Sequence, residues 1–324
     1  MLERLKRKLF FSRAFRNFIK WTRQVQPPGF EGFSLYEISR FFFEAIQKGD
    51  LITRASAISF RVFMAFFPAL IVLLTLIPFV PIADFQERLL DAIYDMLPLD
   101  VYRFIESTLH DLVIRKHTTL LSISFILGVF FASNSVNAIL LGFAGSRNLD
   151  RWHSAFRQRM ISIWVLLALS ILLMMVIPLV TFSGFVIQAL QQIGFFGNFI
   201  QVALVFFIKW AVSLLLVILC VALLFNAGEM RGRRFRIFTP GSILSVFLII
   251  LASEALAFVF THIADYNALY GSIGAILAVQ LWIYINMIVL LIGFELNTSI
   301  SRAHRLRTEK LEQVNKPATS AKHR

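Results

Sequence analysis

The chain of 324 residues contains a single cysteine, Cys220, so a disulfide bond within the chain is excluded. Cys220 lies inside a long apolar run, where a free thiol behaves as a small hydrophobic side chain. The sequence has no Walker loop, GxGxxG loop, HExxH motif or CxxC pair, and its six histidines are too scattered to suggest a metal site. These absences give no support to a hydrolase, a nuclease or an ATP-driven pump. We therefore predict that the chain is not an enzyme and binds no cofactor.

Acidic residues are also scarce, with 19 Asp and Glu against 32 Lys and Arg. By contrast, 58% of the residues are hydrophobic and the mean hydropathy is +0.73. Six runs reach the roughly 20 mostly apolar residues that a membrane-spanning helix needs. They are residues 62–80 (with a start near Gly49), 120–142, 160–183, 199–225, 240–262 and 271–294. The sequence therefore predicts an all-α, polytopic membrane protein with a six-helix transmembrane domain over residues 49–300.

The basic residues lie on alternate connectors between these runs. Eleven fall in residues 1–58, four in 143–159, four in 226–239 and seven after Phe294, against four on all the opposite connectors. The positive-inside rule then places both termini in the cytoplasm of a bacterial inner membrane. Basic cytoplasmic loops attract anionic lipid headgroups, so we expect membrane lipids and not nucleic acid as partners. The basic N-terminus is followed by no apolar signal-peptide region, so we expect no cleaved signal.

Two stretches outside the spans are amphipathic. Within the basic N-terminal segment, 1–48, residues 34–47 have apolar positions at helical spacing and predict a helix in the cytoplasmic interface. Residues 84–114 predict two amphipathic helices broken at Pro98, and their seven acids indicate an acidic extracytoplasmic cap. The basic cytoplasmic tail, 301–324, is polar and is expected to fray after Arg302.

Charged residues inside the spans each cost about 2.5–3.5 kcal/mol at the bilayer centre, so each needs a partner or water. Lys209 and Glu254 lie at similar depth on neighbouring spans, which predicts a pair or a shared polar cavity. Alternatively, Lys209 reaches outward to the interface while Glu254 is protonated. A contact between Arg61 and Glu295 would join the first span to the last. The candidate interior polar residues are Arg54, Arg61, Asn134, Lys209, Glu254, Gln280, Asn286 and Glu295.

The uncharged members of this set have two interpretations. Side-chain amides such as those of Asn134, Gln280 and Asn286 commonly form hydrogen bonds that join helices within a membrane. Together with the charged residues, they would instead line an interior polar cavity. Small residues on the last span predict a smooth face that a neighbouring helix can approach closely. These small residues are Gly271, Gly274, Ala275 and Ala278.

Four stretches resemble the YihY/BrkB family of bacterial inner-membrane proteins. They are "RASAISFRVFMAFFPALIVLL" (54–74), "ASNSVNAILLGFAGSRN" (132–148), "TPGSILSVFLIILASEALAFVF" (239–260) and "YNALYGSIGAILAVQLWIYINMIVLLIGFELN" (266–297). The residues at motif positions are Pro68, Pro240, Gly241, Tyr266, Asn267, Tyr270, Gly271, Gly274, Trp282, Tyr284, Gly293 and Asn297. The resemblance implies six helices with cytoplasmic termini and a link to envelope lipid export or serum resistance. It brings no catalytic residues, and the ribonuclease name that some members carry looks like a misassignment.

Two functions are compatible with these observations. The first is a transporter or an accessory factor for envelope lipid handling and envelope integrity, with an envelope lipid as the substrate. The second is a non-catalytic membrane scaffold that recruits envelope partners through the acidic cap or the basic tail. Phe runs at the outer edge would face either lipid or another copy in a homo-oligomer. A ribonuclease function is supported only by the basic loops and by the ribonuclease name that some family members carry.

Overall fold

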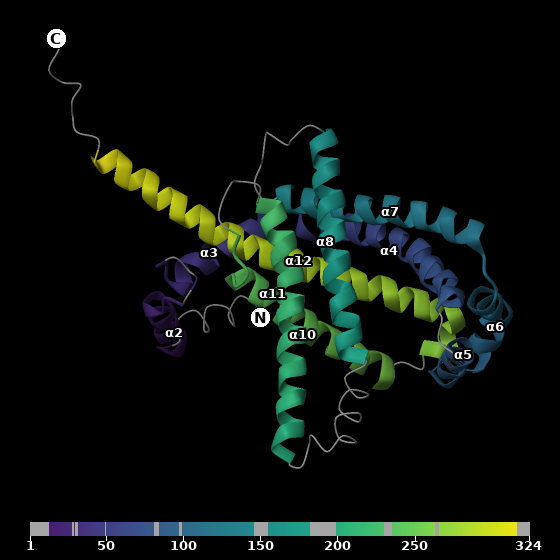
Figure 1. Ribbon diagram of the computed structural model, residues 1–324. Helices are drawn as coiled ribbons and strands as arrows, with labels where there is room; N and C mark the ends of the chain where they lie inside the picture. Colours follow the sequence, from purple (N-terminus) through teal and green to yellow (C-terminus); the bar gives the residue numbers. More distant parts are fainter. Residues whose placement is uncertain are drawn as a thin grey trace, which may run out of the picture.

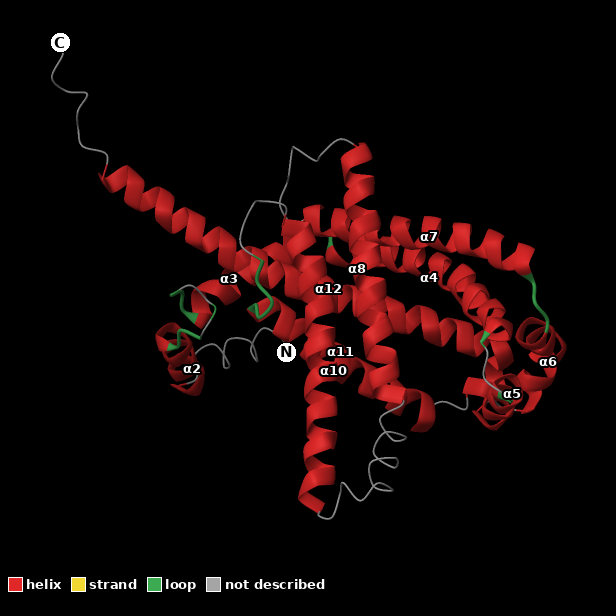
Figure 2. Ribbon diagram, in the orientation of Figure 1, coloured by secondary structure: helices red, strands yellow, loops and turns green. Residues whose placement is uncertain are grey.

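The computed structural model describes residues 13–27, 29, 32–48, 50–80, 84–96, 99–145, 155–181, 199–229, 235–262 and 266–315, with the backbone alone at some helical positions. Every regular element in these ranges is helical, as Figure 2 shows. The fold class predicted from the apolar runs is therefore confirmed for the part of the chain that is described.

Six helices are long and apolar enough to cross a membrane. They are α4 (Leu51–Leu76, followed by the short 3-10 helix η1, Ile77–Phe79), α7 (Thr118–Ala144), α8 (Ala155–Thr181), α10 (Phe199–Glu229), α11 (Pro240–His262) and α12 (Tyr266–Asn315). These helices match the six predicted spans.

The remaining helices lie at two opposite ends of this bundle (Figure 1). At one end lie α2 (Arg13–Gln24), α3 (Leu35–Lys48) and the last turns of α12, and we call it the terminal end. At the other end lie α5 (Phe85–Met96) and α6 (Leu99–Ile114), and we call it the cap end. Between the two ends, α4 packs along α7, while α8 and α10 cross α4, α7 and α12 steeply in this view.

The core of the bundle lies nearer to the terminal end. Its centre is an aromatic cluster from three helices: Phe143 of α7 stacks on Phe294 of α12 with ring centroids 4.2 Å apart. Phe225 of α10 meets both rings edge-on, at 5.5 and 5.7 Å. On the parts of α8 and α10 that extend away from this cluster, large apolar side chains are exposed instead, such as Met174 and Phe207. The helices are therefore closely packed around the aromatic cluster, whereas these parts of α8 and α10 are open.

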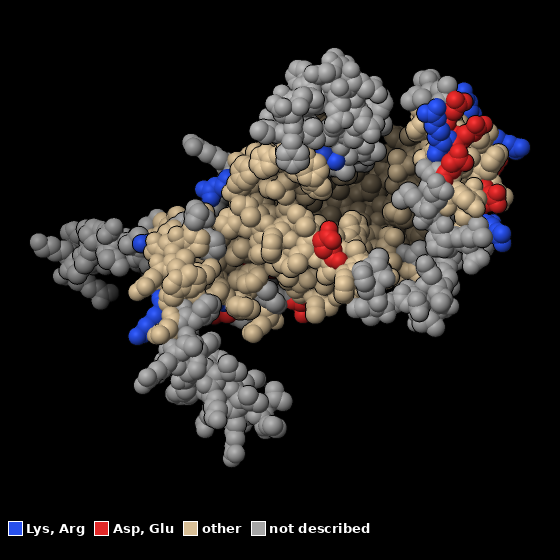
Figure 3. All heavy atoms as spheres, turned by 90° about the horizontal axis from the view of Figure 1, so that it is seen from below, with Lys and Arg blue, Asp and Glu red and all other residues tan. Residues whose placement is uncertain are grey.

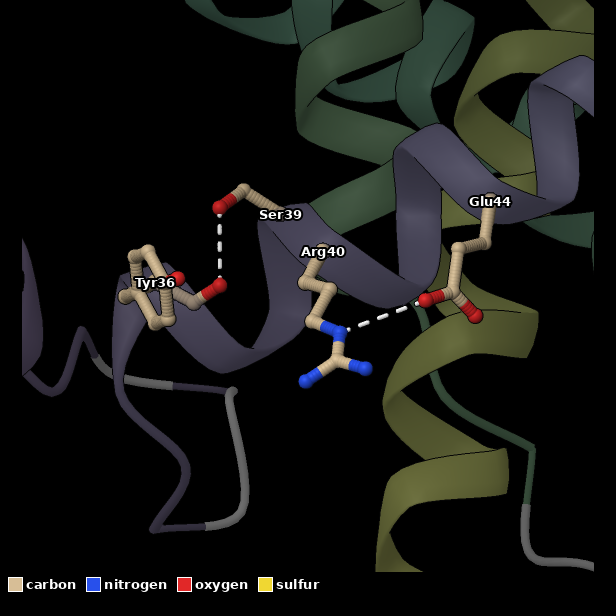
Figure 4. A network of polar contacts seen from close by, with 4 residues as sticks. All are labelled: Tyr36, Ser39, Arg40 and Glu44. Atoms are coloured by element: carbon tan, nitrogen blue, oxygen red, sulfur yellow. Dashed lines mark hydrogen bonds and ion pairs between the residues drawn. The ribbon is translucent and has the colours of Figure 1, made fainter. Parts of the chain in front are cut away.

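At the terminal end, α3 forms where the sequence predicts a helix. Ser34 and Glu37 form a capping box at its start: Ser34 N donates to Glu37 Oε2 (3.0 Å), and Glu37 N donates to Ser34 Oγ (3.3 Å). Hydrogen bonds from Ser34 lower the pKa of Glu37, so this carboxylate stays ionised at neutral pH. Figure 4 shows another side of α3, where Arg40 Nε donates to Glu44 Oε1 (3.2 Å).

The terminal end also holds the continuation of α12. The expectation that the chain frays after Arg302 is wrong, because α12 remains helical to Asn315. Ile300 and Ala303 of α12 are buried against Phe33 and Ile38, in a small apolar cluster separate from the main core. This contact stabilises a helical stretch that its polar composition alone does not predict.

The cap consists of two helices, as predicted. The first ends at Met96 and the second begins at Leu99, while Pro98 itself lies outside the described residues. Leu90 of α5 packs with Leu109 and Val113 of α6, and this cluster contacts the end of α4. The cap is therefore anchored by apolar contacts, and its charged side chains gather at the surface of this end (Figure 3).

The tightest described helix crossing lies between α11 and α12. A Cβ atom placed on Gly241 would overlap Gly293 O, and one placed on Gly293 would overlap Ser245 Oγ and come within 2.6 Å of Gly241 O. Of the small residues predicted to form a smooth face, Gly274 is buried, while Gly271 and Ala275 have no described side-chain environment. The two motif glycines, Gly241 and Gly293, are thus required by this crossing.

We predict that Gly293→Ala lowers the free energy of unfolding by about 1–3 kcal/mol, because backbone atoms of α11 occupy the space of the new methyl group. Gly128→Ala is the matched control, since its Cβ would lie 3.9 Å from the nearest atom, Pro68 Cβ. The free energy of unfolding of both variants is measured by adding SDS to the purified protein in detergent micelles and monitoring the loss of helix packing. Equal stability of the two variants would contradict the tight crossing.

Candidate functional site

The charged residue with the most contacts at the terminal end of the core is Arg54 of α4. Its Nη1 donates to Gly142 O in the last turn of α7 (2.6 Å), where carbonyls have no partner within the helix. Its Nη2 donates to Glu295 Oε1 of α12 (3.0 Å). The Glu295 side chain is 1% exposed, and that of Arg54 is 15% exposed. One guanidinium therefore joins three spans, and we call this contact the three-helix tie.

The predicted contact between Arg61 and Glu295 is wrong. Arg61 is exposed, and its backbone carbonyl instead accepts a hydrogen bond from Ser135 Oγ of α7 (2.7 Å). Arg54 and Arg61 are seven residues apart and share a helix face, but only Arg54 lies at the level of Glu295. The first and last spans are nevertheless joined by a buried ion pair, as expected from the charges.

The motif residue Asn297 holds α11 and α12 together one turn away from this tie. Its Oδ1 accepts a hydrogen bond from Gly241 N (2.8 Å), a backbone donor in the first turn of α11 that has no partner within the helix. Its Nδ2 donates to Thr239 Oγ1 (2.9 Å), which in turn accepts from Ser242 N (3.1 Å). Asn297 thus acts as a cap for the start of a different helix.

Polar groups of α7 are paired with α8. Arg159 Nη1 donates to Asn134 Oδ1 in a very short hydrogen bond, and the guanidinium lies 5.3 Å from the centroid of the Phe130 ring. Gln158 Nε2 donates to Asn137 Oδ1. Asn134 therefore forms the kind of interhelical contact that amides commonly make in membranes. This favours a structural role for Asn134 over a place in an open cavity.

On α12, the amides predicted to face other helices have different surroundings. Asn286 is buried and donates from Nδ2 to the carbonyl of Trp282 within its own helix (2.7 Å). Gln280 has a buried Oε1 with no hydrogen-bond partner among the described residues. Trp282 Nε1 donates to Ser253 Oγ of α11 (3.1 Å), and Tyr284 packs against the main core. Asn286 and Trp282 therefore bond to nearby groups, whereas the Gln280 oxygen has no partner among the described residues.

Lys209 and Glu254 do not form the expected ion pair in this structure. Glu254 is exposed on α11, and Lys209 is half-buried on α10 with Nζ 5.7 Å from the ring centroid of the adjacent Trp210. Both lie on the loosely packed halves of their helices, beside large exposed apolar side chains such as Phe206 and Leu251. Matched depth on neighbouring spans does not ensure contact, because the two side chains can point in different directions around their helices.

The remaining motif residues either lie elsewhere in the bundle or have side chains that are not described. Pro68 lies inside α4, where it removes one backbone donor, and it is the nearest neighbour of Gly128 on α7. The side chains of Tyr266, Asn267 and Tyr270 lie outside the described residues. Among the residues that are described, no group of three or more His, Cys, Asp or Glu is arranged to hold a metal ion.

We predict that Arg54→Met lowers the free energy of unfolding by about 3–5 kcal/mol, because it leaves the Glu295 carboxylate buried without its counter-charge. Arg61→Met is the matched control on the same face, and its exposed side chain should change stability by no more than about 0.5 kcal/mol. SDS titration in detergent micelles measures the free energy of unfolding of both variants. The double variant Arg54→Met/Glu295→Leu should recover part of the stability lost in Arg54→Met, because it no longer contains the unpaired carboxylate. Similar losses for Arg54→Met and Arg61→Met would refute the tie.

Comparisons with known proteins agree with this architecture. A family model described as "Virulence factor BrkB" matches residues 42–318. A ribonuclease-like protein named YfkH from Bacillus subtilis (strain 168) is 25% identical over 258 residues, which cover 79% of this chain and 92% of that protein. A UPF0761 membrane protein from Pseudoalteromonas translucida (strain TAC 125) is 33% identical over 67 residues, or 21% of this chain and 22% of that protein.

A UPF0761 membrane protein from Xanthomonas campestris pv. campestris (strain B100) is 28% identical over 82 residues, covering 25% of this chain and 19% of that protein. No solved structure matches the chain. The family match spans α4 to α12, so it includes the three-helix tie and the Gly241–Gly293 crossing. The chain therefore belongs to the BrkB family of multi-pass membrane proteins, as the resemblance in its sequence motifs predicts.

Proposed function

We propose that the protein handles an amphipathic lipid of the bacterial envelope, as a transporter or an accessory factor, through the exposed apolar surfaces of α10 and α11. The observation that carries this proposal is the position of Lys209 and Glu254. Lys209 is half-buried and Glu254 is exposed, both lie beside exposed apolar side chains, and neither is paired with the other. A charge at membrane depth costs free energy unless a polar group reaches it, and a lipid headgroup would be such a group.

A groove at the cap end supports the same proposal. Its volume is about 560 Å³, and it lies at the start of α7. Lys116, His117 and Thr118 line its polar part, while Leu120 and Ile123 line its apolar part and are exposed. This sequence of polar and then apolar side chains along one helix suits a headgroup followed by an acyl chain.

The orientation of the protein is part of the proposal. The ends of α7 and α10, which precede the basic connectors in the sequence, and the helices α2 and α3 lie on the side of the three-helix tie, and the positive-inside rule predicts that this side is cytoplasmic. The cap and the open helix halves then face the outer leaflet of the inner membrane. The tightly packed half would close the cytoplasmic side of the bundle. We propose membrane lipids as partners, and the broad surface with few charged side chains in Figure 3 leaves room for a homo-oligomer.

The alternative function is a non-catalytic scaffold for envelope proteins. Its support is the cap, whose charged residues gather at one end of the molecule and are well separated from the apolar surface (Figure 3). A ribonuclease has less support, since the described residues include no metal-ligand group and the ribonuclease-like name belongs to a relative with 25% identity. We propose that the protein is not an enzyme.

We predict that native mass spectrometry of the protein extracted in mild detergent detects a specific lipid bound to the wild type. In Lys209→Met/Glu254→Gln, the bound fraction should fall at least fivefold, because both charges that would interact with the headgroup are removed. Arg61→Met is the control, since it removes an exposed charge from the terminal half and should keep the lipid. Equal lipid retention in all three proteins would remove the support for lipid handling, and the scaffold would then be favoured.

A further inference from the structure

A cavity lined by charged residues lies at the terminal end, outside the core. Its volume is about 850 Å³, within the range of small-molecule sites. It lies between the last turn of α2, the start of α3 and the last turns of α12, and we call it the terminal cavity. The residues that define it here are Arg23, Ser34, Tyr36, Glu37 and Arg307.

Two arginines enter this cavity from different helices. The guanidinium of Arg23 of α2 lies over the ring of Tyr36, 4.7 Å from its centroid. That of Arg307 of α12 lies over the ring of Phe33, at 5.7 Å. Stacking on an aromatic ring restricts a guanidinium while its N–H donors stay available for a ligand. The cavity therefore offers two partly ordered cations.

Backbone contacts hold these cations in place. Leu35 N donates to Val25 O (3.0 Å), which fixes the end of α2 beside the start of α3. Gly32 in the connecting loop has a φ of +82°, a left-handed conformation that favours glycine, and its side-chain position faces Arg307 Nη1 at 3.9 Å. The loop geometry thus brings the α2–α3 pair and the end of α12 around one space.

The single acid in the cavity does not neutralise it. Glu37 Oε2 already accepts hydrogen bonds from the backbone N and the hydroxyl of Ser34, at 3.0 and 2.8 Å. The Glu37 carboxylate thus caps the start of α3, and the cavity contains two arginines against this one acid. Lys20 is exposed three residues before Arg23 and extends the basic surface along α2. In the sequence, Arg13 and Arg16 continue the same spacing.

We propose that the terminal cavity binds a phosphate ester through Arg23 and Arg307, and that its source is the headgroup of an anionic phospholipid. Arginine pairs recognise phosphate oxygens through bidentate hydrogen bonds, which a point charge does not provide. The headgroup is favoured as the source because α2 and α3 flank the end of a transmembrane bundle, where a basic helical surface meets anionic lipid. This site lies on α2, α3 and α12, whereas Lys209 and Glu254 lie on α10 and α11, so it goes beyond the function proposed above.

The test is isothermal titration calorimetry of the full-length protein in neutral detergent micelles with dioctanoyl phosphatidylglycerol. Wild type should bind saturably, and Arg23→Gln/Arg307→Gln should bind at least tenfold more weakly. Arg40→Gln is the matched control, because Arg40 is an exposed arginine of α3 that pairs with Glu44 and does not line the cavity. It should bind as wild type does. Arg23→Lys/Arg307→Lys keeps both charges and should retain part of the affinity, which separates loss of binding from loss of folding.

Inorganic phosphate, used as a competitor, distinguishes the two sources of the ligand. Displacement of the lipid only at a large excess of phosphate supports a lipid headgroup, whereas displacement at equal concentration supports a soluble phosphate ester at the same arginines. Equal affinity of wild type and the glutamine double variant, or no binding of either ligand, would overturn the proposal. Because Lys209 and Glu254 are intact in every protein used, failure here leaves the cap-end proposal unaffected.

Discussion

The buried contact of Arg54 with Glu295 and Gly142 is the constraint on which the rest of the bundle depends. A carboxylate that is 1% exposed persists as an ion only with a counter-charge, so α4 and α12 must meet where Arg54 reaches Glu295. The same guanidinium also bonds to the last turn of α7 and fixes the third helix. With the first and last spans joined at this level, the aromatic cluster of Phe143, Phe225 and Phe294 fills the space next to it.

The two halves of the bundle are packed in different ways. Helices in a membrane gain no hydrophobic free energy by associating, so close packing depends on small residues and hydrogen bonds. The terminal half has both, in the Gly241–Gly293 crossing and the bonds from Asn297 to α11. Elsewhere α8, α10 and α11 carry large apolar side chains instead, and many of these are exposed. Surfaces that other helices do not cover are available to lipid, which is why the lipid proposal rests on these surfaces.

Much of this architecture could be predicted from the sequence, since hydrocarbon thickness sets a minimum length for each span and proline marks the break in the cap. Pairings of side chains could not. A seven-residue spacing places Arg54 and Arg61 on one face, but the crossing point of α4 and α12 decides which of them meets Glu295. Depth alone suggested that Lys209 pairs with Glu254, but depth does not fix the direction of a side chain around its helix, and the pair does not form. The basic helix α2 was missed, although Lys20 and Arg23 have helical spacing.

The two proposed sites are energetically separable because the three-helix tie lies between them. Arg307 belongs to the part of α12 that extends past the core and packs on α3, whereas Trp282, which bonds to Ser253 next to Glu254, lies on the other side of Glu295 along α12. At about 1.5 Å per residue, Arg307 is roughly 40 Å along the helix from Trp282. Changes at sites this far apart, with no shared partner, are expected to add. A non-additive response of lipid retention to variants at both ends would therefore show that α12 moves as a unit against the tie.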